Sequence, residues 1–410
     1  MTAVMVINGG RLLINILAFT KSELHMTNKA YQSQKCILKY SKTQIEKAGR
    51  SIRHGCEGDE RADAILKIQN YRETHLYPLM LIKNHIAQAT KKVSKKGIVA
   101  RRLKMLATII DKLERPTLDG DEKNAIQLTR MQDIGGCRAI VENISQLREL
   151  LSRLKDSSSV HQIIRTNDYL KPKDSGYSGV HLIYSCFAGS DEENEWKKTK
   201  IEFQIRTDLQ HAWATSLEII DTLEGIKLKT SMEGHPEWRR FFKIAGQLVA
   251  HTERSCMLSD EEFDGFKIEL RELEGRLEVR RKLSRYNLAI KVTTDKKHLP
   301  RRVLSHQGLF LVRLLRSSEK ESSEEKVALK LQLGAFGPNE METALSDLAK
   351  SEADPEVVIS VLVSAGDVRN LKKAYPNYFG STTKFQSFLT KIIDPDKSSN
   401  TNKALRRTSA

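Results

Sequence analysis

The 410-residue sequence has few cysteines, and none of them lie at the spacing of a metal site. All are scattered over the first 256 residues, with no CxxC pair, at Cys36, Cys56, Cys137, Cys186 and Cys256. This pattern argues against a structural zinc site and against a disulfide scaffold. It favours a reducing compartment, so we expect a cytoplasmic protein.

Long apolar runs are missing as well. No run reaches the roughly 18 residues that a membrane-spanning helix needs, so we expect no membrane segment. The first 25 residues contain apolar patches, but they lack the charged start and the small-residue cleavage site of a signal peptide. We interpret residues 1–39 as an N-terminal extension in which Met26 is a candidate natural start.

The overall composition is typical of a folded globular protein, with 39% hydrophobic and 29% charged residues. The 68 lysines and arginines outnumber the 52 acidic residues and give a net charge of +16. This excess favours a polyanionic partner, either nucleic acid or nucleotide phosphates, and charge alone does not separate the two.

Residues 200–207 alternate between apolar and polar side chains, which is the period of a half-buried strand. Its polar face would present Glu202, Gln204 and Arg206. A carboxylate, an amide and a guanidinium aimed at one space can hold a metal ion and phosphates. The alternative is an exposed sheet face with ordinary salt pairs.

Residues 100–113 are predicted to form one amphipathic helix, with an apolar stripe made by Leu103, Leu106, Ala107, Ile110 and Leu113. Its opposite side would carry Arg101, Lys104 and Lys112, with Arg102 at the flank. A row of cations can bind a triphosphate, because each phosphate oxygen accepts a charge-assisted hydrogen bond. A solvated basic face is the alternative.

Two further segments carry candidate functional residues. Residues 130–142 predict a short strand with Asp133, two glycines and Arg138, where the glycines permit close approach of a ligand or of a neighbouring strand. Residues 168–181 predict a loop with Lys173 and, at its exit, Tyr177. A ring beside lysines can stack a base while the lysines bind phosphate; alternatively, Tyr177 is a core or lid aromatic.

In chain order, four segments resemble the synthetase domain of the RelA/SpoT family: RLKMLATIIDKL, DIGGCR, KPKDSGYSGVH and IEFQIRT. The resemblance covers residues 40–260. It implies an α/β (α+β) fold, in which a mixed, nucleotidyltransferase-like β-sheet is flanked by helices. It also implies an Mg²⁺-dependent pyrophosphokinase that transfers pyrophosphate from ATP to a ribose hydroxyl.

The resemblance assigns roles to residues. Asp133 and Glu202 match the two acidic positions that hold Mg²⁺, and Glu202 is also a candidate base for the attacking hydroxyl; Gln204 joins them as a catalytic residue. The ATP phosphates would be bound by Arg102, Lys104, Lys112, Arg138 and Arg206. The acceptor would be bound by Lys173, Tyr177 and His181.

Two departures from the family pattern bear on function. No histidine is followed by aspartate, the dyad of the hydrolase domain in long members, so we expect no alarmone hydrolase activity. The acceptor loop has Ser175 where the family usually has asparagine, and Ser178–Gly179 replace larger groups. This departure bears on recognition of a guanine nucleotide more than on recognition of ATP.

The rest of the chain is predicted to form a linker helix over residues 261–285, a second small α/β domain over 286–395 and a flexible tail over 396–410. The segment LKKAYPNYFG resembles the regulatory domain of fused toxin–antitoxin synthetases of the CapRel type, in which a Tyr-x-x-Tyr segment blocks the ATP site. The matching residues, Tyr375 and Tyr378, would be autoinhibitory. Alternatively, they fill a local core.

The CapRel-type resemblance implies an anti-phage protein that modifies the 3′ CCA end of tRNA and is released by a phage protein. Candidate tRNA contacts lie in two basic runs, Lys91, Lys92, Lys95 and Lys96, or Arg239, Arg240 and Lys243, each of which is otherwise solvated surface. Two alternatives stay open. One is a (p)ppGpp synthetase that acts on GDP or GTP, and the other is a catalytically silent RNA-binding sensor.

Overall fold

The computed structural model describes residues 4–8, 11–15, 34–115, 125–224, 226, 228, 234–284, 308–318, 327–337, 340–365 and 382–395. Two strands near the N-terminus, β1 (Val4–Asn8) and β2 (Arg11–Asn15), form a separate antiparallel hairpin. The main strands are β3 (Ile98–Leu103), β4 (Gly135–Val141), β5 (Gln162–Asp168), β6 (Val180–Ser185), β7 (Lys200–Thr207), β8 (Gly308–Ser318), β9 (Val327–Phe336) and β10 (Val357–Ala365). The helices are α2 (Lys42–Arg53), α3 (Gly58–Glu73), α4 (Leu76–Val93), α5 (Leu106–Glu114), α6 (Ile144–Lys155), α7 (Asp208–Glu224), α8 (Pro236–Thr252), α9 (Asp260–Leu277), α12 (Met341–Ala353) and α15 (Thr383–Ile393).

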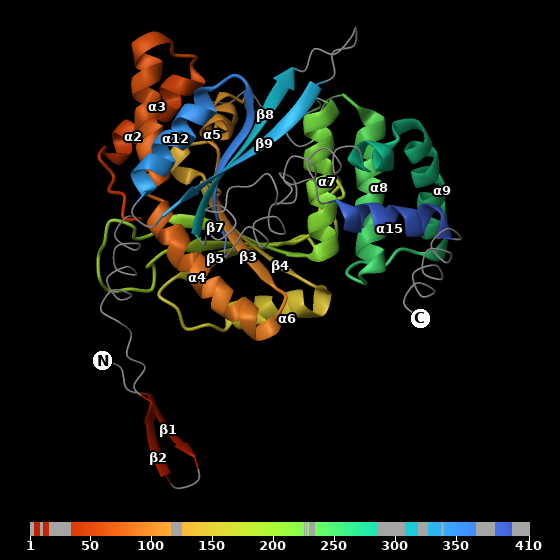
Figure 1. The fold of residues 1–410 in the computed structure, drawn as a ribbon, viewed down its shortest axis with the longest axis horizontal. Coiled ribbons are helices and arrows are strands. Elements are labelled where there is room, and N and C mark those ends of the chain that lie inside the picture. The colour runs from red at the N-terminus through yellow and green to blue at the C-terminus, as the bar shows by residue number, and fades with distance from the viewer. Residues whose placement is uncertain are drawn as a thin grey trace.

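The main strands form one eight-stranded mixed sheet, in the order β5-β6-β7-β4-β3-β10-β8-β9. Only β4 and β7 pair in parallel; the other neighbours are antiparallel. Side chains of α4, α6 and α12 share a buried core with one face of the sheet, and those of α7, α8, α9 and α15 share a second core with the other. Figure 1 shows the second group of helices gathered beside the sheet. The predicted mixed α+β fold is confirmed.

Strand β7 lies between β6 and β4, and its two faces differ as its alternating pattern predicts. Ile201, Phe203 and Ile205 are fully buried in the core that α4 and α6 cover. The opposite face of the strand therefore presents Glu202 and Gln204. Within the described residues, no helix is both long enough and apolar enough to span a membrane.

The helix predicted over residues 100–113 is wrong in its first half. Residues 98–103 form β3, which pairs with β4 along six residues and meets β10 at Arg101 and Arg102. Hydrogen bonds on both edges of the strand outweigh the helical spacing of its apolar residues. The helix α5 begins only at Leu106, and the predicted stripe holds there in part. Leu113 is buried and Leu106 and Ile110 are partly buried, but Ala107 is exposed and Ile109, which lies outside the predicted stripe, is buried.

This correction separates two cations that were expected on one helix. Arg101 and Arg102 point to opposite faces of the sheet, since successive residues of a strand do so. Arg101 is 7% exposed and donates hydrogen bonds to the carbonyl oxygen of Leu76 and to Gln34. Arg102 remains on the face that carries Glu202.

The described C-terminal strands and helices belong to the same sheet and the same two cores as the elements before them. Strands β10, β8 and β9 extend the sheet beyond β3, and β9 was not predicted from the sequence. Leu345 of α12 shares the core of α4, and Phe385 of α15 shares the core of α8 and α9. The second domain was expected to be separate, but its described strands belong to the same sheet. Its regulatory role stays a prediction.

Glu253 lies at the C-terminal end of α8, beside the junction of β7 and α7. Its Oε2 atom is buried and has no hydrogen-bond partner among the described residues. Burial raises the pKa of Glu253 to about 7; Asp208 adds to the rise, and a hydrogen bond with Thr207 opposes it. The ionised carboxylate is therefore poorly accommodated at neutral pH.

We expect Glu253→Gln to stabilise the protein by about 2 kcal/mol more at pH 8 than at pH 5. A carboxyl whose pKa is raised in the folded state favours folding while it is protonated, and this contribution is lost as the pH rises through about 7. Denaturant unfolding at both pH values measures the difference. Glu272→Gln, at an exposed position of α9, is the control. Equal effects at the two pH values would contradict the assignment.

Candidate active site

A cavity of about 130 Å³ lies over β3, β4 and β7, and it is lined by Ala100, Arg102, Lys104, Asp133, Gly136, Cys137, Arg138, Glu202 and Gln204. The sheet register explains most of this set. Arg102, Gly136 and Glu202 face one another across the three strands. Ala100, Arg138 and Gln204 form the next row. Residues paired in this way share one face of the sheet.

Asp133 lines the cavity and is held by two lysines. The Nζ of Lys104 is 2.8 Å from its Oδ2, and the Nζ of Lys112 is 3.2 Å from both carboxylate oxygens. Burial raises the pKa of Asp133, but the charges and hydrogen bonds of the two lysines outweigh it and hold this pKa below its ordinary value. Asp133 is therefore a carboxylate at neutral pH.

Glu202 also lines the cavity and belongs to a chain of hydrogen bonds. His181 Nδ1 is 3.0 Å from Oε1, and Gln204 Nε2 donates to Oε2 at 2.8 Å. Burial raises the pKa of Glu202, yet the contacts with His181 and Gln204 lower it net. Arg206 continues the chain, because its Nη2 donates to Gln204 Oε1 at 2.8 Å.

An aromatic cluster of Tyr169, Tyr177 and His181 adjoins Glu202. The hydroxyl of Tyr177 forms a hydrogen bond with His181 Nε2 and accepts one from Arg206 Nε at 3.1 Å. Tyr169 meets both other rings edge to face, and the Nζ of Lys173 lies 3.9 Å from its ring centroid. The cluster thus combines flat rings with a cation, which is the combination that the sequence analysis expected for binding an acceptor.

The loop that carries Tyr177 rests directly on the backbone of α8. A Cβ atom added to Gly246 would lie 2.0 Å from the carbonyl oxygen of Gly176, and one added to Gly176 would lie 2.3 Å from the carbonyl oxygen of Phe242. Gly176 also has φ +85°, which favours glycine. The same Phe242 oxygen accepts a hydrogen bond from Trp213 Nε1 at 3.0 Å. Helix α8 therefore sets the position of this loop.

The structure brings most of the predicted site residues together. Six of them line the cavity: Arg102, Lys104, Asp133, Arg138, Glu202 and Gln204. Lys112 and His181 each contact one of the two carboxylates, and Lys173 and Tyr177 lie in the adjoining aromatic cluster. Arg206 does not line the cavity; it is 5% exposed and binds Gln204 and Tyr177. Tyr375 and Tyr378 lie outside the described residues, and all these roles stay predictions.

The two glycines of β4 serve the two purposes that the sequence left open. A Cβ atom on Gly135 would lie 2.6 Å from Cδ1 of Ile201, so this glycine permits close approach of the neighbouring strand. On Gly136, the nearest atom to a Cβ would be the carbonyl oxygen of Arg102 at 3.9 Å. Gly136 therefore leaves the floor of the cavity open to a ligand. Sequence reasoning did not single out Tyr169 or Gly246, although Tyr169 stands in the loop that it recognised.

The two carboxylates fit a magnesium ion that is shared with a phosphate ligand. Among the described residues, no three His, Cys, Asp or Glu side chains gather as a complete metal site. Asp133 and Glu202 line one cavity, and the charge of Asp133 opposes the ionisation of Glu202. Mg²⁺ is typically bound by one or two carboxylates, with water and substrate phosphates as its other ligands.

Residues 101–219 match the model of a family described as the region found in RelA/SpoT proteins. The match includes every residue that lines the cavity except Ala100. It confirms that this segment is similar to RelA/SpoT proteins. The CapRel-type fusion stays a prediction.

Curated and solved proteins are also similar to part of the chain. A GTP pyrophosphokinase of Bacillus subtilis, YwaC, is 30% identical over 115 residues, which cover 28% of this chain and 52% of that protein. The chain thus spans about half the length of this relative. Small alarmone synthetase 1 of Bacillus subtilis with its product pppGpp is 18% identical, with a TM-score of 0.36, and the match covers 48% of this chain and 94% of that one. A GTP pyrophosphokinase family protein of Streptococcus pneumoniae is 21% identical, with a TM-score of 0.35 and coverage of 51% and 98%.

Proposed function

We propose that the cavity binds ATP and that the protein is a pyrophosphokinase, which transfers pyrophosphate from ATP to a ribose hydroxyl. The observation that carries this proposal is that two ionised carboxylates, Asp133 and Glu202, line one cavity together with several cationic side chains. These cations are Arg102, Lys104 and Arg138. This combination suits a magnesium–triphosphate complex. The family match over residues 101–219 and the name of the curated relative support the same activity.

Positive charge and alignment would supply most of the catalysis, because phosphoryl-type transfers need little covalent help from the protein. Arg102, Lys104 and Arg138 would bind the phosphates. Lys112 would help Lys104 to keep Asp133 ionised. Asp133 and Glu202 would hold Mg²⁺, which when bound would neutralise charge on the phosphate oxygens.

Glu202 would accept the proton of the attacking hydroxyl, and its neighbours would orient it. In one arrangement of protons every donor meets an acceptor: Arg206 donates to the Tyr177 hydroxyl, Tyr177 donates to His181 Nε2, and His181 Nδ1 donates to Glu202. The carboxylate therefore keeps its charge and a fixed direction.

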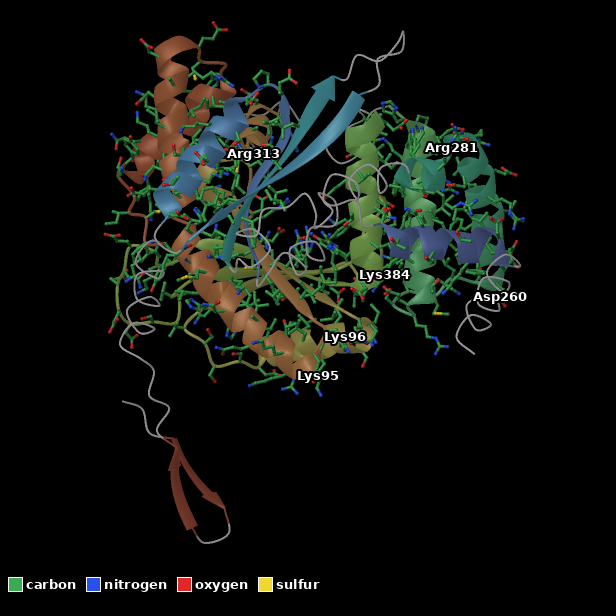
Figure 2. All side chains as sticks on the ribbon, in the orientation of Figure 1. Lys95, Lys96, Asp260, Arg281, Arg313 and Lys384 are labelled. Carbon is green, nitrogen blue, oxygen red and sulfur yellow. The ribbon has the colours of Figure 1, made fainter. Side chains whose placement is uncertain are left out.

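Two acceptors are proposed. GDP or GTP is favoured by the name of the curated relative and by the aromatic cluster beside Lys173. The 3′ end of tRNA is favoured by the net charge of +16, because a tRNA stem needs phosphate contacts beyond the catalytic pocket. Lys95 and Lys96 lie at the turn between α4 and β3, where they could supply such contacts (Figure 2).

In the tRNA case the protein would be an autoinhibited toxin–antitoxin protein that is released by a phage protein. We expect Tyr375→Ala to raise basal transfer to tRNA, because this tyrosine would then no longer cover the ATP site. ATP labelled on its terminal phosphate, offered with GDP, GTP or deacylated tRNA, measures transfer for wild type and variant. Glu202→Gln serves as the inactive control.

Each outcome of this assay discriminates between acceptors. Label on tRNA would support the toxin proposal, and an increase in Tyr375→Ala would support restraint by this segment. Label on GDP or GTP alone would make the protein an alarmone synthetase. Absence of label from all three acceptors, in both proteins, would contradict the pyrophosphokinase proposal and favour the silent RNA-binding sensor.

A further inference from the structure

A buried ion pair joins the C-terminal helix α12 to the N-terminal helix α3. Arg72 Nη2 is 3.1 Å from Glu352 Oε1, and Arg72 Nη1 is 3.2 Å from Glu352 Oε2. The side chains are only 1% and 4% exposed. A pair that is buried to this degree is costly to break, because the remaining partner becomes an uncompensated buried charge.

Both members of the pair also bind the loop between β3 and α5. Arg72 Nε donates to the carbonyl oxygen of Lys104 at 2.7 Å, and the backbone amide of Leu106 donates to Glu352 Oε1 at 3.1 Å. Leu106 begins α5, where a carboxylate is favourable beside the unpaired amides of the helix terminus. The ion pair therefore clamps residues 104–106 from both sides.

This loop positions the two lysines that hold Asp133. Lys104 lies in the clamped segment, and its amide also donates to the carbonyl oxygen of Ile134 at 2.8 Å. Lys112 lies on α5, and Glu352 accepts a hydrogen bond from Leu106, the first residue of this helix. Both ammonium groups reach the same carboxylate, that of Asp133, which lines the cavity. A shift of the loop would move both charges.

We propose that Glu352 is a positioning residue for ATP: through Arg72 and the Leu106 amide it sets the places of Lys104 and Lys112, and so the affinity of the site for the triphosphate. This inference rests on the proposed function of the cavity. It makes α12 a part of the site, in addition to any restraint that the C-terminal region exerts. Among the described residues, the hydrogen bonds of Glu352 go to Arg72 and to the Leu106 amide, so Glu352 would act on the site through them.

The test compares three full-length proteins: wild type, Glu352→Gln and the double variant Arg72→Met with Glu352→Leu. In Glu352→Gln we expect the KM for ATP to rise by about 10- to 100-fold, while the KM for the acceptor stays within about twofold. The double variant removes both charges, so it should recover thermal stability without recovering the KM for ATP. Asp347→Asn, at a partly exposed position of the same helix, controls for loss of charge.

The double variant separates positioning from mere support of the fold. Recovery of both stability and the KM for ATP in this protein would overturn the proposal, and so would an equal rise of both KM values in Glu352→Gln. Calorimetric binding of a non-hydrolysable ATP analogue distinguishes the two levels of inference. If wild type and Glu352→Gln bind the analogue equally well, only the role of Glu352 is overturned. Wild type that fails to bind it would contradict the proposed function itself.

Discussion

Glu202→Gln is expected to reduce pyrophosphate transfer by about 10²- to 10⁴-fold while the protein stays folded. The amide has nearly the same size, so it can keep a hydrogen bond to Gln204, but it carries no charge for a metal ion and accepts no proton from a hydroxyl. Three contributions are therefore lost together: a ligand for Mg²⁺, a base, and the acceptor for His181 Nδ1. Label transfer from ATP measures activity, and circular dichroism measures the fold.

The matched control for this variant is Glu192→Gln. Glu192 is exposed in the loop before β7, so its neutralisation changes net charge equally without touching the site. We expect activity near that of wild type. Full activity in Glu202→Gln would remove Glu202 from the catalytic group, and with it the proposed magnesium site.

Gly246→Ala is expected to raise the KM for the acceptor by about tenfold or more and to leave the KM for ATP nearly unchanged. The new methyl would overlap the carbonyl oxygen of Gly176, so the loop with Lys173 and Tyr177 has to move away from α8. Overpacking of this kind also costs about 1–3 kcal/mol of stability. Initial rates at varied acceptor and ATP concentrations, with denaturant unfolding alongside, measure both effects.

Gly265→Ala supplies the comparison. Gly265 lies in α9, and a Cβ atom there would meet nothing within 4 Å. Alanine is the better helix former, so we expect a gain of about 0.5–1 kcal/mol and unchanged kinetics. If Gly246→Ala kept the acceptor KM of wild type, then the contact with α8 would not set the position of the loop.

The spacing of apolar residues predicted an element correctly where that spacing suits only one kind of secondary structure. The alternation in residues 200–207 identified β7, its buried side and its polar side. Successive side chains of a strand point to opposite faces, so the apolar set is buried together. The same reasoning failed for residues 98–103. There the apolar spacing suits both a helix and a strand, and pairing with β4 and β10 decides between them.

The candidate site was predictable to the extent that its residues stand in short motifs. Asp133, Glu202 and Gln204 were identified in this way. Gly246 and Glu352 were not, because their importance arises from contacts between distant segments. Arg72 and Glu352 are 280 positions apart, and nothing local to either residue marks the other. Contacts of this kind emerge only once the C-terminal strands are seen to extend the sheet.

The clamp between Arg72 and Glu352 also bears on the order of events during synthesis. A ribosome makes Lys104, Asp133 and Glu202 long before it makes Glu352, which follows Glu202 by 150 positions. A nascent chain that stops short of α12 thus has its carboxylates and cations but not the clamp on residues 104–106. On the proposed role of Glu352, a product that lacks α12 would hold ATP weakly, and full activity would await the synthesis of this helix.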